Sequence, residues 1–341
     1  MITTELYYGQ GLGNQLWSYA ILRTLSLKKG YSYGVQSPER FKGKGFLDLD
    51  FGKKVLGVKS DNPNYRRPLG IDKVYFESRV IDIFNQSNIT PFDMNLLEVS
   101  DKTKIEGYFQ SENYLIEYKS LITEWFSHSS PPKVSENLCV INFRGGEYFA
   151  HKGLMLKPEF YFSAIKHMLR IRSDMSFVVV TDDPKLAQIY FPNFPISSKS
   201  ASSANIDKSS KVDLSKISDD FGLIQAAPYL IISNSSFSWW GAWTNAGVRA
   251  VIAPKYWALH NASDGHWSLG DSLTRDWLWQ DRYGNLQTYE ECKLELESFR
   301  NSFNYLESLE INNNWVRKKN VSDFRKFLLS FIMRFHHRTL I

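Results

Sequence analysis

Apolar stretches about as long as a β-strand alternate with helix-like stretches along the first half of the chain. The segments 2–8, 16–28 and 31–36 predict a strand, a helix and a strand, and 112–126 predicts a further helix. Two prolines and several serines follow in SHSSPPKVSEN, residues 127–137, and this composition is typical of a linker. The first half is therefore predicted to fold as one α/β unit.

The same alternation continues beyond the linker. Strands or helices are predicted in the segments 138–146, 158–172, 176–184, 220–228, 229–243 and 249–255. Continuous apolar strands joined by helices indicate parallel, doubly wound sheets. We therefore expect an α/β protein with two Rossmann-like domains, residues 1–130 and 137–310, which face each other across a cleft. Residues 311–341 are expected to form a separate basic tail.

The composition agrees with a soluble globular protein of two domains, because the 341 residues are 43% hydrophobic and 23% charged. The net charge of +5 is mild and partly concentrated near the C-terminus. No zinc pattern or RNA-binding module accompanies it, so no nucleic-acid partner is expected. Two cysteines, Cys139 and Cys292, are too few for a disulfide framework. With no signal-peptide pattern and no run of roughly 20 apolar residues, a cytoplasmic location is expected.

A glycine-rich turn, GQGLGNQLWSYA, joins the first predicted strand to the first helix at residues 9–20. It is not a dinucleotide fingerprint, since Asn14 stands where the third glycine belongs, and no Gly-Lys-Ser/Thr follows to make a P-loop. Gly11, Gly13, Asn14 and Gln15 could offer backbone and side-chain groups to an anion or a sugar hydroxyl at a helix N-terminus. The alternative is a tight strand-to-helix turn without a ligand.

Four polar clusters follow predicted strands: Gly9–Asn14, Arg144–Tyr148, Thr181–Asp183 and Ser233–Ser238. In open α/β sheets, ligands bind beyond the carboxyl ends of the strands. The agreement among the four clusters is more informative than any one of them. We therefore expect the functional site where these strand ends meet.

The first two clusters of the second half carry charged candidates. The Arg144 guanidinium could bind a pyrophosphate through two parallel hydrogen bonds, and Glu147 is a carboxylate within reach of the same site. A surface ion pair is the simpler interpretation. Asp182 and Asp183 could bond a nucleotide base or ribose, or could cap the helix that follows. A metal site is not favoured, because no further ligand cluster accompanies the two aspartates.

The last cluster forms a hydroxyl-rich turn at a predicted helix start. Asn234, Ser235, Ser236 and Phe237 are expected to contact phosphate oxygens there, and an ordinary serine N-cap is the alternative. The tryptophans that follow have helical spacing and are interpreted as packing residues. The seven histidines show no metal-ligand spacing, so no metal is expected.

Five motifs occur in one order along the chain: GLGNQLWSYA, GYFQSENYL, FRGGEY, TDDP and SNSSFSWWGAW. Together they resemble glycosyltransferase family 11, the α-1,2-fucosyltransferases, over about residues 5–257. The resemblance implies a GT-B-like fold, GDP-β-L-fucose as donor, inversion to an α-fucoside and no obligatory metal. It also implies that the C-terminal domain holds most of the donor.

One signature loop departs from the family pattern, which usually reads His-x-Arg-Arg-Gly-Asp-Tyr. Here Arg144 keeps the first arginine, while Gly145 replaces the second and Glu147 replaces the aspartate. A lost cation should weaken anion binding or shift that role to another residue. Two alternatives therefore stay open: the same fold with a different nucleotide-sugar donor, and an inactive sugar-binding homologue.

The resemblance also implies a mechanism. Breaking the sugar–phosphate bond leaves negative charge on GDP, and without a metal, fixed cations and helix N-termini must stabilise it. Arg144 and the turn Ser233–Ser238 are the candidates, and Glu147 is a candidate base for the acceptor hydroxyl. The acceptor is expected to be an oligosaccharide of a surface polysaccharide or O-antigen, with galactose O2 as the attacking hydroxyl and a lipid carrier attached.

The C-terminal tail predicts a basic amphipathic helix that lies on the inner face of the membrane. Its apolar positions, which follow helical spacing with arginines and lysines nearby, are Phe324, Phe327, Leu328, Phe331, Ile332 and Phe335. A terminal helix packed on the protein core is the alternative.

Overall fold

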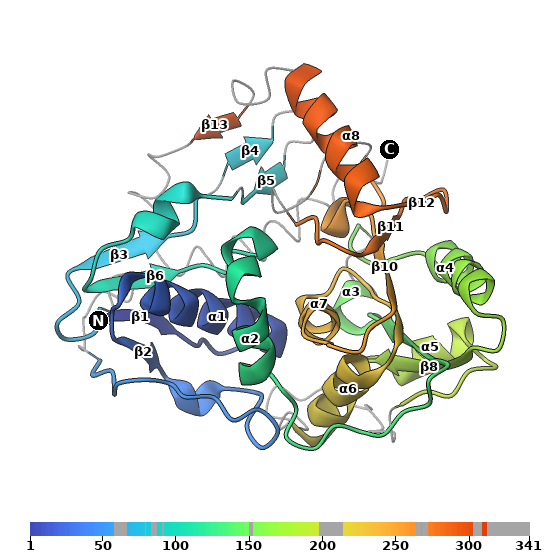
Figure 1. Cartoon of the computed structure of the whole chain (residues 1–341), viewed down its shortest axis with the longest axis horizontal. Helices are drawn as coiled ribbons and strands as arrows, with labels where there is room; N and C mark the ends of the chain where they lie inside the picture. Colours follow the sequence, from blue (N-terminus) through green and yellow to red (C-terminus); the bar gives the residue numbers. More distant parts are fainter. Residues whose placement is uncertain are drawn as a thin grey trace.

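The computed structural model describes residues 1–57, 67–78, 80–82, 87–90, 92–149, 153–197, 214–263, 267, 272–302 and 309–311. Apart from Ile311, the predicted basic tail (residues 311–341) lies outside these residues. Two largely parallel sheets, one from each half of the sequence, stand side by side with helices between and around them (Figure 1). The predicted α/β class with two parallel sheets is confirmed.

The first sheet is entirely parallel and has the strand order β2-β1-β6-β3. Its strands are β1 (Ile2–Glu5), β2 (Tyr33–Gln36), β3 (Lys73–Phe76) and β6 (Thr103–Glu106). The predicted strands at 2–8 and 31–36 are confirmed, whereas β3 and β6 were not predicted. The order places β1 and β6 at the centre, so the segments that follow these two strands emerge next to each other.

Helix α1 (Leu12–Lys29) connects β1 to β2 and begins earlier than the predicted 16–28. It ends at Gly30, whose left-handed backbone (φ 68°) is the usual stop for a helix. Most of its residues are buried, including the polar Gln15, because the helix lies between the first sheet and the second half of the chain. A helix buried on nearly all sides shows little amphipathic periodicity.

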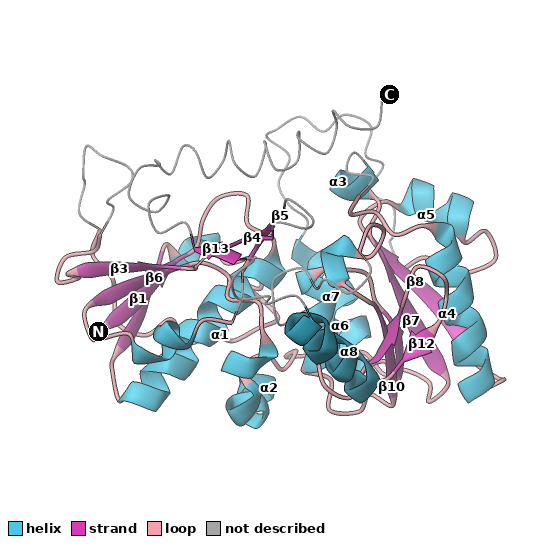
Figure 2. Ribbon diagram, turned by 90° about the horizontal axis from the view of Figure 1, so that it is seen from above, coloured by secondary structure: helices cyan, strands magenta, loops and turns pink. Residues whose placement is uncertain are grey.

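The second sheet has the order β12-β11-β10-β9-β7-β8, and all its strands are parallel except β12. They are β7 (Leu138–Phe143), β8 (Ser176–Thr181), β9 (Tyr229–Ile231), β10 (Ala250–Pro254), β11 (Leu278–Gln280) and β12 (Leu286–Gln287). Figure 2 shows α6 (Leu214–Ala226) and α7 (Ser236–Trp243) between the two sheets, and α4 (Pro158–Ile171) and α5 (Pro184–Tyr190) on the outer side.

The helix predicted at 112–126 is broken into two 3₁₀ turns, η4 (Glu112–Tyr114) and η5 (Ile116–Tyr118), followed by α2 (Lys119–Trp125). The side chains of Glu112 and Tyr114 are both buried. Two residues apart, they would point to nearly opposite faces of an α-helix. The bend therefore lets the chain bury both side chains.

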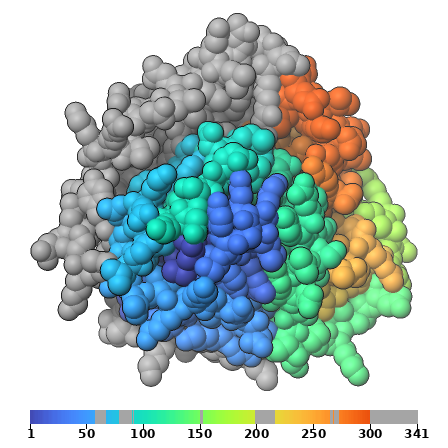
Figure 3. Space-filling model, turned by 60° about the vertical axis from the view of Figure 1, so that its left-hand side comes forward, coloured from blue at the N-terminus to red at the C-terminus, as the bar shows by residue number. Residues whose placement is uncertain are grey.

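The two halves share one core. The ring centroids of Trp17 in α1 lie 4.3 Å from Trp239 and 4.7 Å from Trp240 in α7, and Phe126 lies 4.9 Å from Trp240. The space-filling view shows the first half packed directly against the second (Figure 3). The predicted linker is held as well, because the buried His128 contacts Ser218 through its Nε2 at 2.9 Å. At this junction the two halves are packed together.

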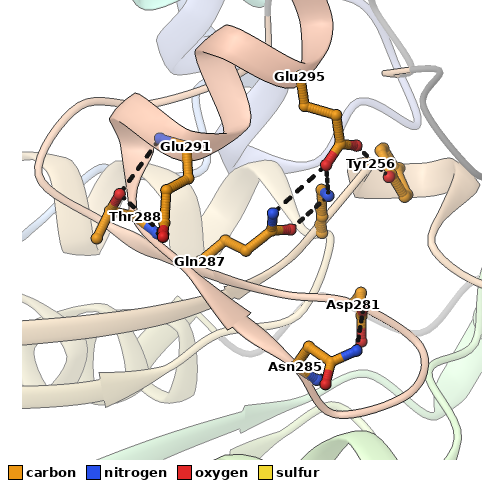
Figure 4. Close-up of polar contacts among 8 residues, drawn as sticks. Tyr256, Asp281, Asn285, Gln287, Thr288, Glu291 and Glu295 are labelled. Atoms are coloured by element: carbon orange, nitrogen blue, oxygen red, sulfur yellow. Dashed lines mark hydrogen bonds and ion pairs between the residues drawn. The ribbon is translucent and has the colours of Figure 1, made fainter.

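The chain also returns to the first half near its end. Helix α8 (Tyr289–Ser302) is attached to the second half through Glu295, which contacts Tyr256 and the buried Lys255 (Figure 4). Strand β13 (Leu309–Ile311) then pairs with β4 (Val80–Asp82), which pairs with β5 (Ser87–Ile89). Residues 309 and 310, predicted to close the C-terminal domain, therefore lie beside the first half.

Candidate functional site

The strand order of the second sheet fixes where a ligand can bind. Counted from β7, its parallel strands run 2-1-3-4-5, and the chain direction of the connections reverses between β7 and β9. Sheets of this order bind ligands in the crevice beyond the carboxyl ends of those two strands. The loop from Arg144 follows β7, and the turn from Ser233 follows β9. Two of the four predicted polar clusters therefore lie at the switch point.

Arg144 is held at this point by Asp182. Its guanidinium Nη1 lies 3.0 Å from Asp182 Oδ2, and both side chains are 27% exposed. The Asp182 Oδ1 atom accepts a hydrogen bond from the Gly145 N–H at 3.0 Å. The Arg144 Nε atom is buried and has no partner among the described residues. The arginine is thus oriented by one carboxylate while keeping donor capacity.

The two glycines of the loop are required by the aspartates behind it. A Cβ at Gly145 would lie 2.7 Å from Asp183 Cβ, and a Cβ at Gly146 would lie 2.5 Å from Asp182 Oδ2. Real Cβ contacts of this length do not occur without movement of a neighbour. The packing of this loop therefore leaves no room for a side chain at position 145, where the signature of the resembled family has its second arginine.

Both aspartates have roles within the protein. Asp183 caps α5, because its Oδ1 accepts the Leu186 N–H at 3.1 Å, as the simpler interpretation of this residue predicted. Asp182 positions Arg144. Capping and positioning are thus roles within the protein for two residues that were also predicted to contact a nucleotide. Among the described residues no cluster of three or more metal-ligating side chains occurs.

The turn after β9 is tied to its surroundings by most of its hydroxyls. Ser233 Oγ donates to Asn142 Oδ1 at 2.6 Å, which joins the ends of β9 and β7. Asn234 donates to the Leu154 carbonyl at 2.8 Å, while its Oδ1 is buried without a partner among the described residues. Phe237, also predicted to contact the ligand, is partly buried and packs against Phe221 with centroids 5.5 Å apart.

Asn14 connects three of the sequence motifs. Its Oδ1 accepts hydrogen bonds from Gln110 Nε2 at 3.0 Å and from Ser236 Oγ at 2.9 Å. Gln110 follows the central strand β6, and Asn14 follows the other central strand, β1. The segments that follow the two central strands of the first sheet therefore meet the start of α7, beside the switch point of the second sheet, at this side chain.

The first turns of α1 and α7 touch each other at the same place. A Cβ at Gly13 would lie 2.4 Å from Phe237 N and 2.5 Å from Ser236 Oγ. Neither helix has an acidic residue in its first turn, and neither Gly11 nor Ser235 makes a side-chain capping bond. Two partially positive helix ends meet here, an arrangement that favours an anion, and the loop of Arg144 is joined to the turn before α7 by the hydrogen bond from Tyr148 to Asn234.

Gln15 has a different role from the predicted one. Its side chain is fully buried, its Nε2 donates to the Arg40 carbonyl at 2.9 Å, and its Oε1 accepts the Lys42 N–H at 2.9 Å. Both ends of the amide are used, so Gln15 holds the segment around Lys42 and offers nothing to a ligand. Of the predicted residues in this turn, Gly11 stays exposed.

Glu147 lies on the short helix α3 (Gly146–Phe149) and is exposed. Its carboxylate interacts electrostatically with Lys42 of the first half. Burial lowers the pKa of Lys42, and Glu147 acts to raise it. Tyr148, beside it, donates to the Asn234 carbonyl at 3.3 Å and lies under the Arg144 guanidinium, 5.1 Å from the ring centroid. The loop after β7 is thereby fixed to the turn after β9.

No family model matches the chain. It is 25% identical over 280 residues to an alpha-1,2-colitosyltransferase of Escherichia coli, which covers 72% of this chain and 89% of that protein. It is 23% identical over 297 residues to the O-antigen biosynthesis glycosyltransferase WbnK of Escherichia coli, covering 74% of this chain and 93% of that protein. The chain is thus similar to two bacterial glycosyltransferases, one of them named for O-antigen biosynthesis. This similarity confirms the resemblance inferred from the motifs and supports glycosyl transfer as the reaction.

The solved structures that match this chain are more distant in sequence. POFUT1 in complex with GDP-fucose matches at 8% identity and a TM-score of 0.35, over 74% of this chain and 96% of that one. The KpsC beta-Kdo 2,7 transferase of Thermosulfurimonas dismutans matches at 10% identity and a TM-score of 0.25, over 88% and 99%. Scores this low carry no argument about the site.

Three residues with contacts at or near this junction, Gln110, Glu112 and Lys42, were not among the predicted site residues. Gln110 and Glu112 belong to the quoted motif GYFQSENYL, so a closer comparison within that motif could have found them. Lys42 has no local signature, because its environment is made by Gln15 and by a loop about a hundred residues away in sequence.

Within the described part of the chain, no helix has the length and apolar character needed to cross a membrane.

Proposed function

We propose that the protein is an inverting glycosyltransferase that moves L-fucose from GDP-β-L-fucose to a hydroxyl of an O-antigen or surface-polysaccharide acceptor, with galactose O2 as the attacking group. One observation carries the proposal: the first turns of α1 and α7 meet beside the switch point of the second sheet, and Arg144 lies on the loop that follows the adjacent strand β7. That arrangement fits the diphosphate of a nucleotide sugar. The α-1,2 linkage named for the colitosyltransferase relative supports the position of the bond.

The leaving group determines what the site must do. When the bond between the sugar and the phosphate breaks, the electron pair stays with GDP, and the sugar ring gains positive charge. Arg144 and the helix N-termini are already fixed in place, so they can stabilise the new negative charge without reorganising. The proposal includes no obligatory metal, and we expect transfer to be unaffected by EDTA.

The acceptor hydroxyl attacks from the face opposite to the GDP, and its proton needs a base. Glu147 is our candidate, because it is an exposed carboxylate on the loop that carries Arg144. We propose that the acceptor is carried on a lipid and that the basic tail, residues 311–341, brings the enzyme to the inner face of the cytoplasmic membrane. No nucleic-acid partner enters the proposal.

A second donor is favoured by a specific observation, the name of the colitosyltransferase relative. Colitose is L-fucose without its 3-hydroxyl group, so a site for one sugar differs from a site for the other by a single polar contact. A pocket that hydrogen-bonds the 3-hydroxyl would reject colitose, whereas an apolar pocket would reject fucose only weakly.

The first test is a thermal-shift panel with GDP, UDP, CMP and dTDP. A ligand present at about 100 times its Kd stabilises by about 2.7 kcal/mol, which is readily measured. We expect a shift with GDP alone. Turnover of GDP-fucose against GDP-colitose with a galactose-terminated acceptor then assigns the sugar. A shift with UDP or dTDP would reject the donor, and binding without turnover on any acceptor would favour the inactive sugar-binding homologue.

A further inference from the structure

We propose that Lys42, from the first half of the chain, supplies the second cation that binds the donor diphosphate, in place of the arginine that Gly145 has replaced. The inference rests on the proposed function in one respect: the ligand at the junction contains a nucleoside diphosphate. It assigns a residue from outside the signature loop, on the opposite side of the junction between the two halves.

The position of Lys42 is fixed by the helix that makes the junction. The Lys42 N–H donates to Gln15 Oε1 at 2.9 Å, and the fully buried Gln15 also bonds the Arg40 carbonyl at 2.9 Å. Gln15 lies in the first turn of α1, and two residues earlier Gly13 touches Ser236 of α7. The backbone of Lys42 is therefore connected to the point where the two helix ends meet.

The ammonium group of Lys42 is half-buried and has no hydrogen bond or ion pair among the described residues. The more deeply buried lysines Lys104 and Lys255 are paired: Lys104 lies 2.7 Å from Glu5, and Lys255 lies 2.5 Å from Glu295. Burial of an unpaired charge is unfavourable, and it lowers the pKa of Lys42. An anionic ligand would restore the lost interaction.

The loop on the other side cannot bind a diphosphate on charge alone. Arg144 is the one cation in the segments 144–149 and 181–184, and it shares them with Glu147, Asp182 and Asp183. Asp182 already pairs with Arg144 at 3.0 Å. An arginine at position 145 is blocked, because its Cβ would lie 2.7 Å from Asp183 Cβ. A second cation would come from outside these two segments. Within the loop, Glu147 interacts electrostatically with Lys42 and acts to raise its pKa.

The test compares the affinity for GDP with the affinity for guanosine, measured by calorimetry on the full-length protein. Lys42→Met should weaken GDP binding by about tenfold to a hundredfold, the range for a hydrogen bond to a charged group, and leave guanosine within twofold. Lys44→Met is the matched control: the same change two residues away, at an exposed side chain, should alter neither affinity. Lys42→Arg should restore most of the GDP affinity.

Other outcomes overturn the inference. An unchanged ratio of GDP to guanosine affinity in Lys42→Met would show that Lys42 does not contact the diphosphate. If Lys42 only offsets the negative charge of Glu147, then Lys42→Met should no longer weaken GDP binding when Glu147→Gln is also present. If the wild type binds UDP in place of GDP, the donor proposal fails, and the UDP-to-uridine ratio tests Lys42 in the same way. If no nucleotide binds better than its nucleoside, both proposals fail.

Discussion

At the scale of single residues, Gly11 and Gly13 of the opening turn differ in their surroundings. Gly13 touches the first turn of α7, whereas a Cβ at Gly11 would meet nothing within 4 Å. Both belong to the motif GLGNQ, and the sequence alone treats them alike. Only Gly13 is required by packing, because a side chain there would push α1 away from Ser236 and Phe237.

Gly13→Ala is therefore expected to destabilise the protein by about 1–3 kcal/mol, the usual cost of overpacking, and to lower transferase activity with it. The activity should fall because Asn14, the next residue, loses its place beside Ser236. Gly11→Ala should leave the free energy of unfolding unchanged to within about 0.5 kcal/mol, since its backbone (φ −70°) suits alanine. Urea denaturation of both variants measures the difference. Equal destabilisation by the two substitutions would contradict the assignment.

A buried aspartate close to the site makes stability depend on pH. Burial raises the pKa of Asp220 from 3.8 to about 6, with Asp182 contributing in the same direction, while Ser197 donates to its Oδ1 at 3.1 Å. The folded state therefore holds this proton more tightly than the unfolded state does. Stability from this group is complete below about pH 4 and is lost as the pH rises through about 6.

Asp220→Asn, which cannot ionise, should match the wild type at pH 4 and exceed it above pH 7 by up to about 3 kcal/mol, at about 1.36 kcal/mol for each unit of pKa. The difference between variants must be measured, because His260 opposes the effect. Burial lowers the pKa of His260 to about 4, so its contribution is lost as the pH falls through the same range. Denaturant titrations from pH 4 to pH 8 give the result, and a difference that stays constant with pH would refute it.

At the scale of elements, the broken segment 112–126 has a function that a continuous helix could not serve. Glu112, in η4, accepts the Trp243 Nε1–H at 3.1 Å and the Arg275 N–H at 2.9 Å, and lies 3.0 Å from Arg275 Nη1. Burial raises the pKa of this carboxyl, while its donors act in the opposite direction. One carboxylate thus joins the first half to α7 and to the chain near β11.

Glu112→Ala should cost about 3–5 kcal/mol, because it leaves the buried indole and backbone donors and the arginine without their acceptor. Glu117 is the matched control: it lies in the next turn, its side chain is 73% exposed, and its Lys28 partner is 3.8 Å away. Glu117→Ala should change the free energy of unfolding by less than about 0.5 kcal/mol. Comparable losses in the two variants, measured by guanidinium denaturation, would rule out the bridging role.

The elements that sequence patterns predicted are those with continuous apolar strands or clear helical periodicity, such as β7, α4 and β8. Strand β6 was missed because its sequence, TKIE, alternates charged residues with apolar ones. Its Lys104 is buried and contacts Glu5, Glu106 and Tyr7. A lysine is rarely buried unless it is paired, and the partner in β1 is about a hundred positions away. No local pattern could reveal that pairing.

At the scale of the whole molecule, the motifs predicted which loops come together, whereas the contacts of single side chains depend on the fold. Arg144 and Asn14 do lie where the strand ends converge. Asp183, Gln15 and Phe237 proved to cap, position and pack, because polar or aromatic side chains in such loops serve the fold as readily as a ligand. The two halves are in contact through a common core, to which Trp17, Trp239 and Trp240 contribute.

This shared core predicts that the two halves unfold together, although each has its own sheet. We expect a single calorimetric transition whose van't Hoff enthalpy equals the calorimetric enthalpy. Trp17→Ala should cost about 3–5 kcal/mol and should also broaden or divide the transition, because Trp17 contacts α7 across the junction. Trp279→Ala provides the control: this residue is equally buried, but its aromatic neighbours, Trp267 and Trp277, belong to the same half. It should lower the melting temperature while the transition stays single, and two transitions in the wild type would mean that the halves are independent domains.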